Sequence, residues 1–124
     1  MDTKLKGRYG ELLAAEYLKK KKYKIIGMGY RVRQGEIDVI AENRQYVVFA
    51  EVKLRRDDHF AEAKEFVTPA KQKRLLAAAQ QWLQINDPSR QPRFDVIEVY
   101  APLGIETKKP VIRHWENAFG ADFG

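Results

Sequence analysis

Two neighbouring runs of alternating apolar and polar residues restrict most strongly how this chain can fold. They cover residues 36–42 and 46–54 and read EIDVIAE and YVVFAEVKL. A period of two residues predicts β-strands, and the polar turn at Asn43-Arg44 predicts that the strands pair as an antiparallel hairpin.

A two-residue turn would place Glu42 opposite Gln45, so that every facing pair of residue numbers sums to 87. In this register one side of the hairpin is apolar, and a one-residue slip would mix the two sides. The apolar side holds Ile37, Val39, Ala41, Tyr46, Val48, Ala50 and Val52. The other side holds Ile40, Val47 and Phe49 near the turn, then Glu36, Asp38, Glu51 and Lys53. The charged groups therefore gather at one end of an otherwise buried hairpin.

This charged end has the composition of a metal site. In the predicted register Asp38 and Glu51 lie diagonally across the pair, roughly 7–8 Å apart. Two carboxylates at that spacing can hold Mg²⁺, which prefers oxygen ligands, and Lys53 follows Glu51 on the same side. A metal beside a lysine can orient water and offset charge that develops on a phosphate. The alternative is a solvated ion-pair patch on an edge hairpin.

The remaining elements surround this hairpin. Residues 5–18 have the spacing of a helix, with an apolar stripe of Leu5, Tyr9, Leu12, Leu13 and Tyr17. A second stripe of small residues plus one acid, Gly7, Glu11, Ala14 and Leu18, could lie close against a neighbouring element. Short extended pieces are predicted at residues 23–26 and 30–33, and strands at 93–100 and 111–115.

A second helix is predicted after a long loop over residues 55–67. Thr68 is placed as its N-cap and Pro69 as its first residue, and it runs to about Ile85. The order of helix, strands, helix and strands predicts one α/β domain over residues 1–124, with helices packed around a mixed sheet.

Charge and composition indicate the kind of partner. The 124 residues carry a net charge of +6 and no cysteine, which suits a polyanion and excludes thiolate chemistry. The start of the chain lacks the apolar stretch of a secretory signal, and the longest apolar run, residues 75–79, is far too short to span a membrane. We expect a soluble, cytoplasmic protein with no membrane partner.

Several motifs together resemble a known group of enzymes. Residues 35–40, GEIDVI, and 49–55, FAEVKLR, resemble the core of the PD-(D/E)xK nucleases, most closely in the uncharacterised bacterial YraN-like family. The resemblance covers nearly the whole chain. It includes Gly10-Glu11, Lys71-Gln72, the RFDV sequence at 93–96 and the HWENAF sequence at 114–119.

This resemblance implies a restriction-endonuclease-like three-layer sandwich, with a central mixed five-stranded sheet flanked by helices, similar to archaeal Holliday-junction resolvases. It also implies that Asp38 and Glu51 bind the metal, Mg²⁺ or Mn²⁺, that Lys53 is the catalytic lysine, and that Glu11 is a fourth catalytic member. The alternative for Glu11 is a surface ion pair with Arg8 or a lysine.

Other polar residues complete the predicted site or lie outside it. Those expected to contact nucleic acid are Arg31, Arg33, Arg55, Lys71 and Gln72. For Lys71 and Gln72 the alternative is an ordinary solvated helix start, and Glu36 either joins the metal or pairs with Arg31 or Arg33. We interpret Asp57-Asp58-His59 as a loop, His114 as structural, and Asp95 as a support for the sheet or for an arginine.

Two functions of different classes follow. The first is a structure-selective, metal-dependent endonuclease that hydrolyses phosphodiesters, in DNA rather than RNA. The second is a nucleic-acid-binding or adaptor protein that keeps the fold without chemistry. In either case a homodimer or a partner protein could complete the substrate groove.

Overall fold

The computed structural model describes residues 3–56, 68–86 and 88–119, and the side chains from Arg8 onward. In chain order the elements are α1 (Thr3–Lys20), β1 (Lys24–Val32), β2 (Gly35–Glu42), β3 (Tyr46–Arg55), α2 (Pro69–Asn86), β4 (Gln91–Tyr100), the short 3₁₀ helix η2 (Gly104–Glu106) and β5 (Val111–Phe119). The predicted tripeptide Asp57-Asp58-His59 and most of its loop lie outside the described residues.

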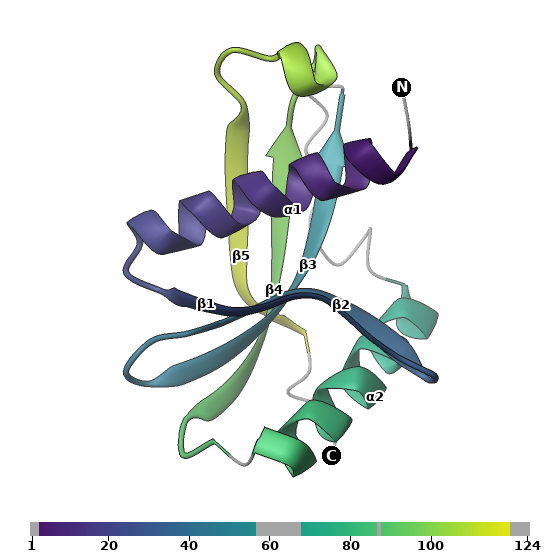
Figure 1. The fold of residues 1–124 in the computed structure, drawn as a ribbon, viewed down its shortest axis with the longest axis vertical. Coiled ribbons are helices and arrows are strands. Elements are labelled where there is room, and N and C mark those ends of the chain that lie inside the picture. The colour runs from purple at the N-terminus through teal and green to yellow at the C-terminus, as the bar shows by residue number, and fades with distance from the viewer. Residues whose placement is uncertain (1–2, 57–67, 87, 120–124) are drawn as a thin grey trace.

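The five strands form one mixed sheet in the order β1-β2-β3-β4-β5. All neighbours are antiparallel except β3 and β4, which are parallel and joined through α2. A parallel pair requires such a crossover, whereas β2 and β3 need only a tight turn. Helix α1 runs across one face of the sheet and α2 packs on the other (Figure 1). The predicted three-layer α/β sandwich with a mixed five-stranded sheet is confirmed.

Helix α1 buries its small-residue stripe rather than its larger apolar one. Ala14 and Leu18 are fully buried against the β2–β3 hairpin, whereas Leu12 is 49% exposed. The predicted close approach of the small-residue stripe to a neighbouring element is therefore confirmed for Ala14 and Leu18. The sheet presents small side chains such as Ala41 and Ala50 to α1, so a stripe of small residues brings the helix close.

Helix α2 begins as the sequence predicts. Thr68 Oγ1 accepts a hydrogen bond from the Lys71 backbone N–H (3.2 Å), which satisfies one of the free donors at the helix start. Leu75 and Ala79 then pack against Phe49 on the second face of the sheet. Over the described residues, neither helix is both long and apolar enough to cross a membrane.

The hairpin register differs from the predicted one by two residues. Val39 pairs with Ala50, so facing residue numbers sum to 89 rather than 87. The turn is centred on Arg44-Gln45 because Asn43 Oδ1 accepts the backbone N–H groups of Gln45 (2.9 Å) and Tyr46 (2.7 Å). An asparagine side chain commonly imitates a turn in this way. A shift of two residues largely preserves the sorting of side chains between faces, but it changes which residues face each other.

Two strands are longer than expected. β1 is one continuous strand rather than two short pieces, and its pairing with β2 shifts by one residue between Ile25 and Gly27. β5 continues past Trp115 to Phe119, with a similar shift opposite β4.

Candidate active site

The site forms where β2 and β3 separate. The observed pairs end at Val39 with Ala50, and the next residue on each strand is Asp38 on β2 and Glu51 on β3. The two strands no longer pair here, and the Asp38 and Glu51 side chains interact with each other across the opening. Beyond them, the Val52 N–H donates a hydrogen bond to Asp38 Oδ2 (2.8 Å). The Asp38 side chain thus accepts the Val52 N–H, which would donate to the Ile37 carbonyl if the strand pairing continued.

This separation also corrects the predicted place of Ile37. Ile37 was expected on the same side as Val39, but it packs in the core under α2 with Ile40 and Phe49. The regular alternation therefore fails across Asp38, the position at which a carboxylate replaces the backbone as the partner of β3.

Three elements bring the four expected catalytic side chains together. Asp38 comes from β2, Glu51 and Lys53 from β3, and Glu11 from α1. Lys53 Nζ lies 3.7 Å from Glu51 Oε1, and these two side chains are 21% and 16% exposed. Glu11 reaches Asp38 from the helix, and the interaction between the two carboxyl groups raises the pKa of Glu11. Glu11 therefore belongs to the cluster and is more than a surface partner of Arg8.

Burial and mutual repulsion make it unfavourable for all of these carboxyl groups to be ionised together. Burial, followed by the negative charge of Asp38, raises the pKa of both Glu11 and Glu51 to about 7. Burial raises the pKa of Asp38 too, although the Val52 N–H opposes that shift. Lys53 only partly offsets the effect on Glu51. Near neutral pH the cluster thus retains protons that a bound cation would displace.

The donor set fits Mg²⁺ in an open geometry. Asp38 and Glu51 supply hard carboxylate oxygens from facing positions, and Mg²⁺ is usually held by one or two carboxylates together with water and substrate phosphate. No closed group of three or more His, Cys, Asp or Glu ligands occurs in the part of the chain that the structure describes. The residues are therefore suited to a site that is completed by water and substrate.

A cleft of about 210 Å³ opens beside Glu51. It is lined by Glu36 and Glu51 from the sheet and by Lys71 and Arg74 from α2. Glu36 also forms an ion pair with Arg31 (3.1 Å), which is the arginine pairing that the sequence left as one of two alternatives. One wall of the cleft is acidic and the opposite wall is basic.

The structure separates the residues expected to contact nucleic acid. Lys71 lines the cleft, whereas Gln72 lines a different hollow with Pro69, Ala70 and Lys73. Arg31 and Arg33 are exposed around the β1–β2 turn, and Arg55 is partly buried at the end of β3. Arg74, which continues the basic turn that begins at Lys71, also lines the cleft, because an i, i+3 spacing on a helix places both residues on one side.

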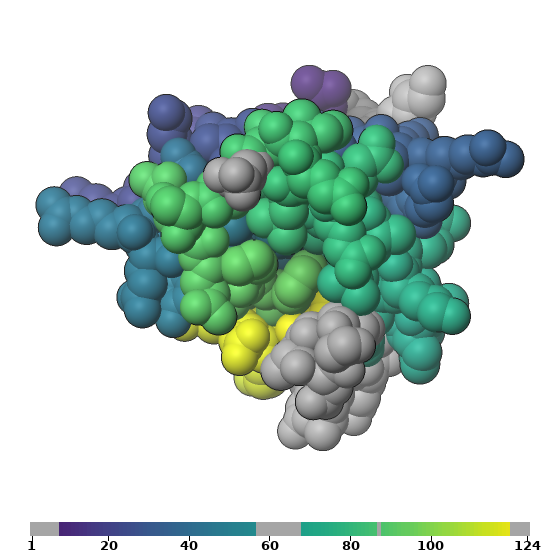
Figure 2. Space-filling view, turned by 90° about the horizontal axis from the view of Figure 1, so that it is seen from below, coloured from purple at the N-terminus to yellow at the C-terminus, as the bar shows by residue number. Residues whose placement is uncertain are grey.

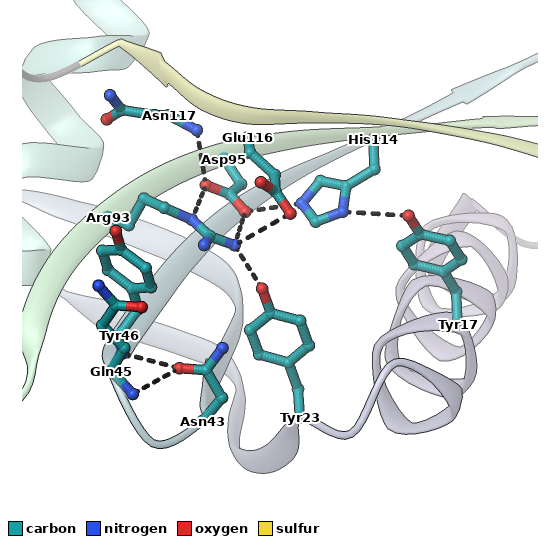
Figure 3. Close-up of polar contacts among 10 residues, drawn as sticks. All are labelled: Tyr17, Tyr23, Asn43, Gln45, Tyr46, Arg93, Asp95, His114, Glu116 and Asn117. Carbon is teal, nitrogen blue, oxygen red and sulfur yellow. Dashed lines mark hydrogen bonds and ion pairs between the residues drawn. The ribbon is translucent and has the colours of Figure 1, made fainter.

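Asp95 has the supporting role that the sequence suggested for it. Arg93 donates to both Asp95 oxygens (2.9 and 2.8 Å), and His114 Nε2 lies 2.6 Å from Asp95 Oδ2 (Figure 3). Arg93 also donates to the Tyr23 hydroxyl (2.6 Å), while Tyr17 Oη lies 3.1 Å from His114 Nδ1. Although burial opposes it, hydrogen bonds from His114 and Arg93 lower the pKa of Asp95. This network connects α1 to β4 and β5, and none of its residues lines the cleft beside Glu51.

The sequence analysis missed a second buried acid on β4. Glu98 is fully buried, pairs with Lys53 in the parallel register, and accepts a hydrogen bond from Trp115 Nε1 (2.8 Å). Its place between the apolar residues Ile97 and Val99 was the available signal.

Comparison with known proteins shows the family. The model of the Uncharacterised protein family UPF0102 matches residues 10–99. The chain belongs to the UPF0102, or YraN-like, family. A UPF0102 protein of Alkaliphilus oremlandii is 43% identical over 116 residues, covering 91% of this chain and 96% of the relative. One of Caldanaerobacter subterraneus is 40% identical over 121 residues, covering 96% and 98%.

A third UPF0102 protein, from Flavobacterium psychrophilum, is 38% identical over 113 residues, covering 91% of this chain and 92% of the relative. The segment matched by the UPF0102 model contains Glu11, Asp38, Glu51, Lys53 and Lys71. The family's name carries no activity, so a function must be argued from the geometry of these residues.

Proposed function

We propose that this UPF0102 protein is a Mg²⁺-dependent nuclease that hydrolyses phosphodiester bonds in nucleic acid, with DNA as the preferred substrate. The observation that carries the proposal is the contact of the Asp38 and Glu51 side chains where β2 and β3 separate. Lys53 lies on the same strand as Glu51, and Glu11 approaches Asp38 from α1.

In this proposal Asp38 and Glu51 hold the metal, for which Mn²⁺ could substitute. When bound, the ion supplies a Lewis acid that lowers the pKa of water and offsets negative charge on the phosphate. Lys53 donates a hydrogen bond to a phosphate oxygen, and Glu11 accepts a proton from the attacking water. The water oxygen forms a bond to phosphorus, the bond to one ester oxygen breaks, and that leaving oxygen gains a proton.

The proposed substrate contacts are to phosphates. The net charge of +6 favours a polyanion, and Arg31, Arg33, Arg55, Lys71 and Gln72 are proposed to contact the backbone. Phosphate contacts position a nucleic acid without selecting its sequence, so we propose selectivity for the structure of the substrate. A second copy of the chain or a partner protein would extend the groove.

The test is cleavage of a labelled panel of duplex, single-stranded, flapped and four-way-junction DNA, and structured RNA, with Mg²⁺, Mn²⁺ or EDTA. We expect metal-dependent cutting of at least one DNA, and a loss of at least about 100-fold in the Asp38→Ala and Glu51→Ala variants with binding retained. Glu16→Ala, which removes an exposed carboxylate from α1, is the control and should cut normally.

Binding without cutting under every condition would contradict the nuclease and favour the adaptor function. Cutting at the normal rate by Asp38→Ala would contradict the assignment of this residue.

A further inference from the structure

The cleft beside Glu51 has a basic wall that the carboxylate cluster does not explain. Lys71 and Arg74 face the cleft from the first turns of α2, opposite Glu36 and Glu51. Glu36 is already paired with Arg31 and Glu51 lies near Lys53. Lys71 and Arg74 are therefore additional cations beside acids that already have a basic neighbour.

Close packing fixes the position of this wall. Gly35, at the start of β2, lies so near the backbone of Arg74 that an added Cβ would meet its carbonyl carbon at 2.5 Å. Figure 2 shows the teal-green N-terminal part of α2 next to the dark-blue residues that lead into β2. The Thr68 cap fixes the helix start from the other side. Lys71 is thus held at a defined place relative to Asp38, which lies three residues after Gly35.

Lys71 lies close to the functional side chains of β3. Lys71 and Glu51 line the same cleft, and Lys53 Nζ lies 3.7 Å from Glu51 Oε1. Both lysines thus lie around Glu51, and like charges at short range repel. An anionic group bound between them would remove that repulsion. A phosphodiester is an anion of suitable size for a cleft of about 210 Å³.

We infer that Lys71 is a second catalytic lysine, which contacts a non-bridging oxygen of the scissile phosphate from the side opposite Asp38 and Glu51. This inference rests on the proposed function. Lys53 and Lys71 would then hold the phosphate from β3 and from α2. Both would offset the charge that develops as the water oxygen bonds to phosphorus and the ester oxygen leaves.

The experiment compares Lys71→Gln with Lys73→Gln. Both remove one exposed positive charge near the start of α2, but Lys73 lies in the hollow lined by Gln72 and does not line the cleft. Single-turnover cleavage of the best DNA is measured with Mg²⁺, and binding of the same DNA is measured in EDTA. Lys71→Arg and Glu51→Gln are included.

We expect Lys71→Gln to lower the cleavage rate at saturating enzyme by about 100-fold, and Lys73→Gln to change it by less than about threefold. In EDTA both variants should lose a similar, small amount of affinity, since each removes one exposed positive charge near the start of α2. Lys71→Arg, which keeps the charge, should retain more activity than Lys71→Gln.

The possible failures are distinguishable. Cleavage that is lost in Glu51→Gln but equal in Lys71→Gln and Lys73→Gln would overturn the role of Lys71 and leave the nuclease intact. If Lys71→Gln and Lys73→Gln lose the same amount of cleavage rate, and the loss disappears at higher enzyme concentration, Lys71 has a binding role only. That result would also overturn the catalytic role of Lys71. A wild-type protein that cuts none of the substrates would overturn both proposals.

Discussion

At the scale of single residues, the carboxyl groups of the site are more informative than its lysine. Asp38 accepts a backbone N–H from β3 and interacts with both Glu11 and Glu51. Each neighbour has its pKa raised to about 7, first by burial and then by the charge of Asp38. Lys53 and Lys71 lower the pKa of Glu51, and Arg8 lowers the pKa of Glu11, but burial and Asp38 outweigh these cations. An excess of buried negative charge is typical of a site that awaits a cation.

This titration predicts how Mg²⁺ affinity depends on pH. A carboxyl group with a pKa of about 7 is ionised in roughly a tenth of molecules at pH 6 and in roughly nine tenths at pH 8. Protons compete with the metal, so lowering the pH weakens binding. Calorimetric titration should show Mg²⁺ affinity at least about tenfold higher at pH 8 than at pH 6.

The control is Glu51→Gln, which should bind weakly at both values because one of the two ligands is lost. Equal affinity of the wild-type protein at pH 6 and pH 8 would contradict the placement of the metal among these carboxyl groups.

At the scale of elements, the junction of β2 with α2 sets the geometry of the cleft. Gly35 allows the strand to touch the helix backbone, and only a residue without a side chain fits there. The same contact orients Lys71 and Arg74 toward Glu51. A glycine in this position therefore acts on the site through the packing of a helix.

We predict that Gly35→Ala lowers the free energy of unfolding by about 1–3 kcal/mol or more, because the new methyl group overlaps the Arg74 carbonyl. Urea denaturation measures the change. Gly10→Ala is a matched control in α1, where the added Cβ would lie 3.5 Å from Leu54 Cβ, an ordinary contact. Because alanine favours a helix, Gly10→Ala should be neutral or stabilising by about 0.5–1 kcal/mol. Equal stability of Gly35→Ala and wild type would show that the two elements are not in contact.

At the scale of the whole molecule, a buried polar network joins the layers on the side of α1. Arg93 and Asp95 lie on β4, His114 on β5, and Tyr17 on α1 (Figure 3). Each of these side chains has a hydrogen-bond or ion-pair partner in the network, and buried charge is tolerated only when it is paired in this way. The network connects α1, β4 and β5, and none of its residues lines the cleft beside Glu51.

We predict that Asp95→Asn destabilises the protein by about 3–5 kcal/mol, since it removes the buried and closer of the two charge partners of the Arg93 guanidinium. Urea denaturation is again the measurement. Glu116→Gln, which alters a carboxylate that is 56% exposed and 3.8 Å from Arg93, should cost less than about 1 kcal/mol. Mg²⁺ affinity of folded Asp95→Asn should match the wild type, and a selective loss of that affinity would place Asp95 in the site instead.

The local sequence pattern was sufficient to predict the helices and strands and to identify the charged residues that cluster. Alternation in residues 36–54 determines which side of each strand is apolar, and the Thr68-Pro69 pair has one favourable place at a helix start. Asp38, Glu51 and Lys53 consequently came together even though the predicted register was displaced by two residues. A displacement of an even number keeps most side chains on their faces, so the error did not separate them.

Tertiary structure alone decided everything that depends on how one segment meets another. The Asn43 side chain set the turn and so the register in which Val39 pairs with Ala50, which brings Asp38 and Glu51 to the end of the paired region. Packing against small residues of the sheet selected the Ala14 and Leu18 face of α1, which brings Glu11 to the cluster. The contact of Gly35 with Arg74 brought the basic side of α2 to the cleft. Sequence periodicity reports which face of an element is buried, but the fit between two surfaces depends on shapes that are present only once both have folded.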